Sequence, residues 1–181
     1  MSEHNIEKAL LEAILFLETE PAGIPALAKV SDLSQELVKV LLEQIAADLS
    51  ASPHRGIELV QLAGGYLLLP KEELWSRLKD RYGKKNDSRL SRAALETLSI
   101  IAYSQPITRG ELENIRGVSA DGMIRILQER NLVKVVGKKD IPGKPAQYGT
   151  TREFLKFFRL ASIADLPKLA PQDQERFELN G

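Results

Sequence analysis

The stretch that most constrains the fold of this chain runs from Leu95 to Val136. Its sequence is LETLSIIAYSQPITRGELENIRGVSADGMIRILQERNLVKVV. Apolar residues recur there at helical spacing in three short segments, turn signals separate the segments, and a β-type run follows. This order predicts a helix-turn-helix with a β-hairpin, or wing, behind it.

A second copy of the pattern lies 85 residues upstream. At this shift Pro21 aligns with Pro106, and Ser34 aligns with Ser119. The matching apolar positions are Leu10 with Leu95, Ala13 with Leu98, Leu15–Phe16 with Ile100–Ile101, Leu27 with Leu112, Val30 with Ile115, Val38 with Met123, and Leu41–Leu42 with Ile126–Leu127. Agreement of a turn proline and a capping serine at one shift favours duplication over chance. We therefore expect a mainly α chain with small β-hairpins, an α+β fold of two tandem winged-helix domains.

Breaks in the apolar pattern suggest four segments. Residues 1–76 form the expected N-terminal winged helix, and residues 77–90 form a basic linker interrupted by Gly83. Residues 91–167 form the C-terminal winged helix, and residues 168–181 form a polar, flexible tail.

Helix starts and buried stripes follow from local signals. We expect N-caps at Asn5, Ser34, Ser91 and Ser119, and capping boxes at Thr108–Glu111 and Thr150–Glu153. A hairpin turn is expected at Gly64–Gly65. The residues predicted to face inward on the first two helices are Ile6, Leu10, Ala13, Ile14, Leu17, Leu27 and Val30.

The composition restricts the possible chemistry. The chain has 43% hydrophobic and 28% charged residues and contains no Cys, which excludes disulfides, thiolate metal sites and a Cys nucleophile. No apolar run approaches the ~18 residues of a membrane span, and the first residues do not resemble a signal peptide. We expect a soluble, cytoplasmic protein.

The net charge of zero hides an asymmetry. Residues 1–76 hold 5 basic and 12 acidic side chains, a net charge of −7. Residues 77–160 hold 18 basic and 9 acidic side chains, a net charge of +9. The opposite signs suggest different partners for the two halves, or mutual attraction between them.

The expected helix-turn-helix surface is poor for reading DNA. A reading helix needs side chains that bond base edges near its N-terminus. The outward residues expected on the third helix of the second copy are Asp121, Arg125, Gln128 and Glu129, of which two are acidic. Possible phosphate contacts lie instead in the linker and the wing, at Lys84, Lys85, Lys138, Lys139 and Lys144. A solvated charged linker and turn is the more frequent explanation of such lysines, so DNA contact is expected to be non-specific at most.

Candidate catalytic residues are lacking. His4 and His54 have no partner at metal-site or triad spacing, and the chain has no phosphate-binding glycine loop and no G-x-S-x-G or H-E-x-x-H motif. The sequence therefore predicts neither an enzyme nor a bound cofactor.

Several linked motifs resemble the family of segregation and condensation protein B. They are RGIELVQLAGGYLLLP from Arg55, AYSQPITRGELENIRGV from Ala102, GKKDIPGKPAQYGTTREFL from Gly137, and the S-x-x-D-L-P close at Ser162. The resemblance covers about residues 6–167 and departs at Arg159, where the family pattern has Gly.

The resemblance implies a non-catalytic subunit of bacterial condensin. Such a subunit forms a homodimer through its N-terminal domain and binds the kleisin, segregation and condensation protein A, which joins it to the SMC ATPase on the nucleoid. We take Arg109, Arg116, Arg125, Tyr148 and Thr151 as candidate kleisin contacts, because they are expected to point outward beside these motifs. The alternative is a DNA-binding transcriptional regulator with two winged helices.

Overall fold

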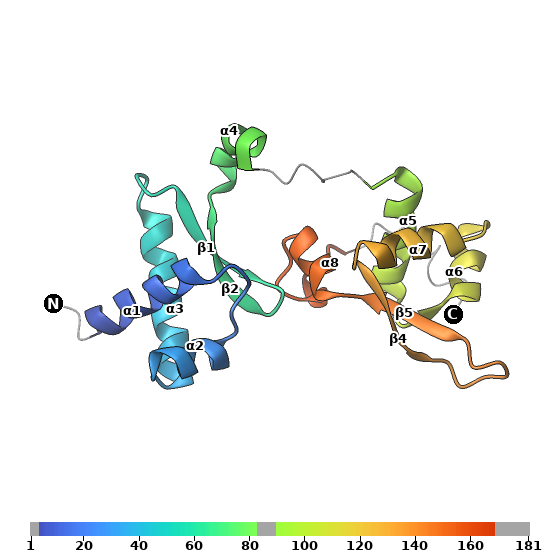
Figure 1. Ribbon diagram of the computed structural model, residues 1–181, viewed down its shortest axis with the longest axis horizontal. Helices are drawn as coiled ribbons and strands as arrows, with labels where there is room; N and C mark the ends of the chain where they lie inside the picture. The colour runs from blue at the N-terminus through green and yellow to red at the C-terminus, as the bar shows by residue number, and fades with distance from the viewer. Residues whose placement is uncertain (1–3, 83–89, 169–181) are drawn as a thin grey trace. The chain divides into compact units, whose positions relative to one another are not determined.

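The computed structural model describes residues 4–82 and 90–168, which fall into two compact units (Figure 1). The division lies between Asp87 and Ser88. Each unit has its own hydrophobic core and is described separately below.

The N-terminal unit consists of three helices, a β-hairpin and a further helix. The elements are α1 (Asn5–Leu17), α2 (Ile24–Ser31), α3 (Gln35–Ala51), β1 (Ile57–Leu62), β2 (Gly65–Pro70) and α4 (Glu72–Tyr82). Residues Leu11, Ile14 and Leu15 of α1 pack with the inner faces of α2 and α3. The strands β1 and β2 pair antiparallel and pack onto this core through Leu59, Tyr66 and Leu68.

Two local predictions are confirmed for this unit, and the predicted hairpin turn is displaced. The Ser34 hydroxyl caps α3 by accepting from the amide of Leu37 at 3.2 Å. All five residues of the apolar stripe on α3 are buried; they are Val38, Leu41, Leu42, Ile45 and Leu49. The hairpin turn sits at Ala63–Gly64, both at positive φ, while Gly65 already belongs to β2.

The C-terminal unit repeats the plan. Its elements are α5 (Arg92–Ser104), β3 (Ile107–Thr108), α6 (Arg109–Arg116), α7 (Asp121–Glu129), β4 (Val133–Lys138), β5 (Ala146–Thr150), α8 (Arg152–Phe157) and a 3-10 turn (Ile163–Asp165). The antiparallel sheet has the order β3-β5-β4. Leu98, Ile101, Leu112 and Leu127 are at the centre of the core. Ser91 caps α5, and Thr108 and Glu111 form the predicted capping box.

The duplication is visible in the element bounds, but the first helices α1 and α5 coincide at a shift of 87 residues, so the pairs predicted there at 85, such as Ala13 with Leu98, are out of register. Helices α2 and α6 coincide at the 85-residue shift, and each ends on a residue in the left-handed conformation, Asp32 or Gly117. Ala22 bridges to Tyr66, and its counterpart Ile107 pairs with Tyr148 in β5. Both units are therefore winged helices, as predicted, with α2–α3 and α6–α7 as the helix-turn-helix pairs.

Several predicted inward residues of the N-terminal unit are exposed. Ile6, Leu10 and Leu17 of α1 and Val30 of α2 lie at the surface, and so does Ala13. Helix α1 is apolar on more than one side, so helical spacing alone did not distinguish the core side from an open side.

Three predicted caps are also wrong. Helix α1 starts one residue early, with His4 in the N-cap position predicted for Asn5. Ser119 does not cap α7, because the N-cap position falls on Ala120. Thr150 and Glu153 form no capping box; Thr151 caps α8 by accepting from the amide of Phe154 at 3.1 Å.

Candidate protein-binding surfaces

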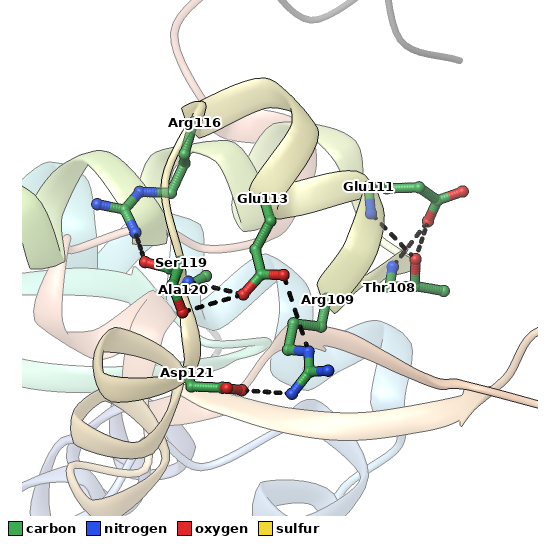
Figure 2. Close-up of polar contacts among 8 residues, drawn as sticks. All are labelled: Thr108, Arg109, Glu111, Glu113, Arg116, Ser119, Ala120 and Asp121. Atoms are coloured by element: carbon green, nitrogen blue, oxygen red, sulfur yellow. Dashed lines mark hydrogen bonds and ion pairs between the residues drawn. The ribbon is translucent and has the colours of Figure 1, made fainter.

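The two helices of the C-terminal helix-turn-helix are joined by a polar network (Figure 2). Arg109, the first residue of α6, donates through Nη1 to Oδ1 of Asp121 at 2.7 Å. Its Nε lies 4.0 Å from Oε2 of Glu113. Hydrogen bonding and charge from Asp121 raise the pKa of Arg109 above its usual value. The guanidinium therefore ties the start of α6 to the start of α7.

Glu113 supplies the cap that Ser119 does not. Its Oε1 accepts from the amide of Ala120 at 2.9 Å and from the Ser119 hydroxyl at 3.3 Å. A carboxylate at this position also interacts favourably with the positive end of the α7 dipole. The N-terminus of α7 is thus capped by a side chain from the preceding helix.

Arg116 closes the same turn from its other end. Its Nη1 donates to the carbonyl of Ser119 at 2.9 Å, and its Nε is buried without a hydrogen-bond partner among the described residues. Arg109 and Arg116, two of the predicted partner contacts, are therefore engaged within the unit. Because Asp121 and Glu113 lie where phosphates would approach α7, the surface opposes direct base reading.

The other three predicted contacts have different surroundings. Arg125 is exposed on α7 and forms no hydrogen bond or ion pair with any residue that the structure describes. Tyr148 packs against the core from the central strand β5. Thr151 caps α8 and donates its hydroxyl to the carbonyl of Asn131. Of the five, only Arg125 presents an unengaged charge.

Among the lysines of the wing, one is engaged within the unit and two are not. Lys139 forms an ion pair with Glu111 of the capping box. The hydrogen bond from Lys139, with those from the amide and hydroxyl of Thr108, lowers the pKa of Glu111 to about 2. Lys138 and Lys144 are exposed and have no such partner in the described part of the chain. Lys84 and Lys85 lie outside the described residues.

An apolar face on α1 was not predicted. Phe16 and Leu17 are each 77% exposed. Phe16 borders a shallow depression of about 330 Å³, which is lined by Ala9, Glu12, Ala13, Phe16, Ile57 and Leu68. We call these six residues with Leu17 the α1 face. The sequence indicated this face only through the excess of apolar residues in α1 over the number that one buried stripe requires.

An apolar cleft of about 280 Å³ lies between α5 and α8 in the other unit. It is lined by Leu98, Ser99, Ala102, Tyr103, Phe154, Phe158, Leu160, Leu166 and Pro167. The Tyr103 hydroxyl donates to the carbonyl of Pro167 at 2.7 Å and so fixes the segment that bounds the cleft. Arg159, beside the cleft, has a φ of 54°. This left-handed conformation is one that Gly adopts without strain, in agreement with the Gly expected at this position from the resemblance.

Residues 4–82 and 90–168 hold neither a cluster of metal-ligating side chains nor a membrane-spanning helix. Within these ranges no three His, Cys, Asp or Glu residues cluster as metal ligands. None of the helices in these ranges has the length and apolar character needed to cross a bilayer.

Comparison with known proteins gives consistent results. Residues 9–169 match the family model for segregation and condensation complex subunit ScpB. Segregation and condensation protein B of Syntrophotalea carbinolica is 44% identical over 164 residues, covering 90% of this chain and 81% of the relative. The protein of the same name from Symbiobacterium thermophilum is 42% identical over 163 residues, covering 90% and 74%.

One similar solved structure is a dimer of the ScpB N-terminal domain complexed with an ScpA peptide. It is 31% identical, covers 48% of this chain and 99% of its own, and superposes with a TM-score of 0.43, too low to transfer residue contacts. The sequence matches, which span nearly the whole chain, place the protein in the segregation and condensation complex subunit ScpB family.

Proposed function

We propose that this chain is a non-catalytic subunit of a bacterial SMC–kleisin condensin and acts by binding the kleisin, segregation and condensation protein A. The observation that carries the proposal is the family match over residues 9–169. The ATPase chemistry of such a complex belongs to the SMC subunit. A cytoplasmic location at the nucleoid follows from this role.

The surface of the C-terminal unit supports a protein partner over a DNA site. In a DNA-reading helix-turn-helix, basic and amide side chains near the start of the second helix face the major groove. Here Asp121 and Glu113 lie at that position, and they engage Arg109 within the unit. The scaffold is therefore used for something other than base reading, as the same fold permits.

The N-terminal unit supports self-association. The α1 face combines exposed aromatic and aliphatic side chains with a depression between α1 and the hairpin. Large exposed apolar side chains gathered on one face are typical of protein interfaces. We assign this face to homodimerisation through the N-terminal domain, 1–76.

Co-purification tests the kleisin proposal. The full chain and its own kleisin, expressed together, are expected to elute as one complex in size-exclusion chromatography at physiological salt. A kleisin that elutes separately from the wild-type chain would refute the proposal. A mobility-shift assay with duplex DNA tests the regulator alternative, which requires sequence-selective binding that survives physiological salt.

Light scattering tests the dimer. The full chain is expected to be a dimer, and Phe16→Glu with Leu17→Glu is expected to be a monomer. Val118→Glu is the matched control, because Val118 is also an exposed apolar residue but lies in the C-terminal unit. A monomeric wild type, or a double variant that stays dimeric, would refute the assignment of the α1 face.

A further inference from the structure

The strand β4 has an open edge. The sheet order β3-β5-β4 places β4 at the end of the sheet (Figure 1), and its pairing partner is β5. Among the described residues, no backbone hydrogen bond engages the other edge of Val133–Lys138. An edge with free N–H and C=O groups is a template on which an extended peptide can add as a further strand.

The middle of this edge is apolar. Val135 is 50% exposed and Val136 is 47% exposed. An added strand would therefore find apolar neighbours in the middle of the edge. The ladder shifts register between Val135 and Gly137, which marks a bulge at this point. Bulges are over-represented at sheet edges, where they re-aim side chains.

The edge is also basic. Lys134 and Lys138 are exposed, and neither has a hydrogen-bond or ion-pair partner within the described ranges. Lys139, the next residue, is already paired with Glu111. Lysines on an edge strand oppose pairing with a like-charged strand, including β4 of a second copy. They favour a strand that carries carboxylates.

We infer that the outer edge of β4 binds an extended, acidic segment of the kleisin as an additional β-strand. The inference rests on the proposed function and names the binding mode. Carboxylates of the segment lie opposite Lys134 and Lys138, and its apolar side chains lie beside Val135 and Val136. Backbone hydrogen bonds to β4 hold the segment, and the acidic and apolar side chains at these positions select it.

Duplex DNA is the other ligand that a basic wing attracts. Phosphates would neutralise Lys134 and Lys138 but would leave the strand edge unpaired and the two valines without a partner. A strand of acidic and apolar residues satisfies all three features, so the observations favour the peptide.

The experiment uses the full chain with overlapping synthetic peptides that tile its kleisin, followed by the intact kleisin. The peptides that bind are expected to be acidic with interspersed apolar residues. Hydrogen exchange of the β4 amides is expected to slow when the kleisin binds. Charge reversal of both lysines, Lys134→Glu with Lys138→Glu, is expected to weaken binding roughly tenfold or more. Lys144→Glu at the wing tip is the matched control and is expected to have a smaller effect.

The outcomes separate this inference from the proposed function. Kleisin that binds without slowing β4 exchange, and equally well to the double variant, overturns the strand assignment and leaves the proposed function intact. Failure of the intact kleisin and of all its peptides to bind the wild-type chain overturns both. If duplex DNA slows hydrogen exchange of the β4 amides and the kleisin does not, the edge is assigned to nucleic acid and the inference is overturned. Unchanged circular dichroism of the variants checks that these exposed substitutions leave the fold intact.

Discussion

The two units have the same order of helices and wing, but the end of the first helix differs in exposure between them. The bounds of the two first helices coincide at a shift of 87 residues, at which Phe16 corresponds to Tyr103 and Leu17 to Ser104. Phe16 and Leu17 are each 77% exposed, whereas Tyr103 and Ser104 are partly buried. The end of the first helix is thus open in the N-terminal unit and partly covered in the C-terminal unit.

The helix that follows the wing explains the difference. In the C-terminal unit α8 follows β5 and places Phe154 in the core with Leu98. In the N-terminal unit α4 follows β2 at the same place in the order, and none of its residues is buried. The first unit therefore lacks the cover that the second unit builds from its own chain. An external cover, supplied by a second copy, is what the proposed dimer provides.

The largest effect is expected from a comparison of one buried and one exposed residue of the two first helices. Ile101→Ala removes fully buried methyl groups and is expected to lower the free energy of unfolding of the C-terminal unit by about 2–5 kcal/mol. Phe16→Ala is expected to change the stability of a dilute, monomeric sample by less than about 0.5 kcal/mol. Native-state hydrogen exchange, which reports on each unit separately, measures both values.

Concentration distinguishes the two substitutions further. The cost of Phe16→Ala is expected to grow with protein concentration, because only the dimer buries this side chain. The cost of Ile101→Ala is expected to be independent of concentration. Equal losses for both variants in dilute solution would mean that Phe16 is covered as fully as Ile101 within its own unit, and would break the comparison.

The wings provide the next comparison. A Cβ on Gly65 would lie 2.7 Å from the carbonyl carbon of Pro21, and one on Gly149 would lie 2.9 Å from Oε1 of Gln105. Both glycines thus touch the turn that follows the first helix. Gly65→Ala is expected to cost about 1–3 kcal/mol, because backbone must move, and Gly149→Ala less, because side chains can give way. Thermal denaturation of the full chain measures the losses.

Gly110 is the control for these glycines. A Cβ at this exposed position in α6 meets nothing within 4 Å. Gly110→Ala is therefore expected to stabilise the C-terminal unit by about 0.5–1 kcal/mol through helix propensity. A stability loss at Gly110 similar to that at Gly65 would show that close contact is not the cause.

The features predicted correctly are those that depend on a few neighbouring residues. The capping box of Thr108 and Glu111, the caps at Ser34 and Ser91, and the stripe of α3 all arise within one or two turns of helix or along one helix face. The order of helices and wing follows from the same signals. Two winged helices were therefore predictable from the sequence.

The site was less predictable, because its contacts join residues that spacing does not relate. Arg109 and Arg116 were predicted to point outward to a partner, but acceptors on the neighbouring helix and turn engage them. Tyr148 was predicted to contact a partner, but its side chain is partly buried against the core. The face of α1 is open because α4, which has no buried residue, does not cover it, and no pattern within α1 encodes this. Contact of the five candidates with a kleisin stays a prediction.

The caps of α3 and α7 allow a smaller test. Ser34→Ala is expected to cost the N-terminal unit about 1 kcal/mol, since the hydroxyl caps the helix directly. Ser119→Ala at the equivalent position is expected to cost less than half of that, and Glu113→Ala about 1–2 kcal/mol. Urea denaturation of the three variants gives the values. A larger loss at Ser119 than at Glu113 would restore the predicted serine cap.

The smallest expected effect is a pH dependence confined to one unit. Glu111 has a folded pKa of about 2, below its ordinary value of 4.5, and its counterpart at the 85-residue shift is Ala26. A depressed folded pKa contributes stability above pH 4.5 that is lost as the pH falls from 4.5 towards 2. Hydrogen exchange in α6 is expected to accelerate over this window, and Glu111→Gln is expected to reduce the acceleration.

The ion pair of Lys139 with Glu111 can be tested within the same window. Lys139→Met removes this half-exposed pair, keeps the bonds from Thr108, and is expected to cost less than about 1 kcal/mol at neutral pH. The hydrogen bond from the lysine is the largest of the causes that lower the pKa of Glu111, so its loss is expected to raise that pKa and to start the acceleration at a higher pH. An unchanged pH profile of exchange in Lys139→Met would contradict this and leave the two bonds from Thr108 as the cause of the low pKa.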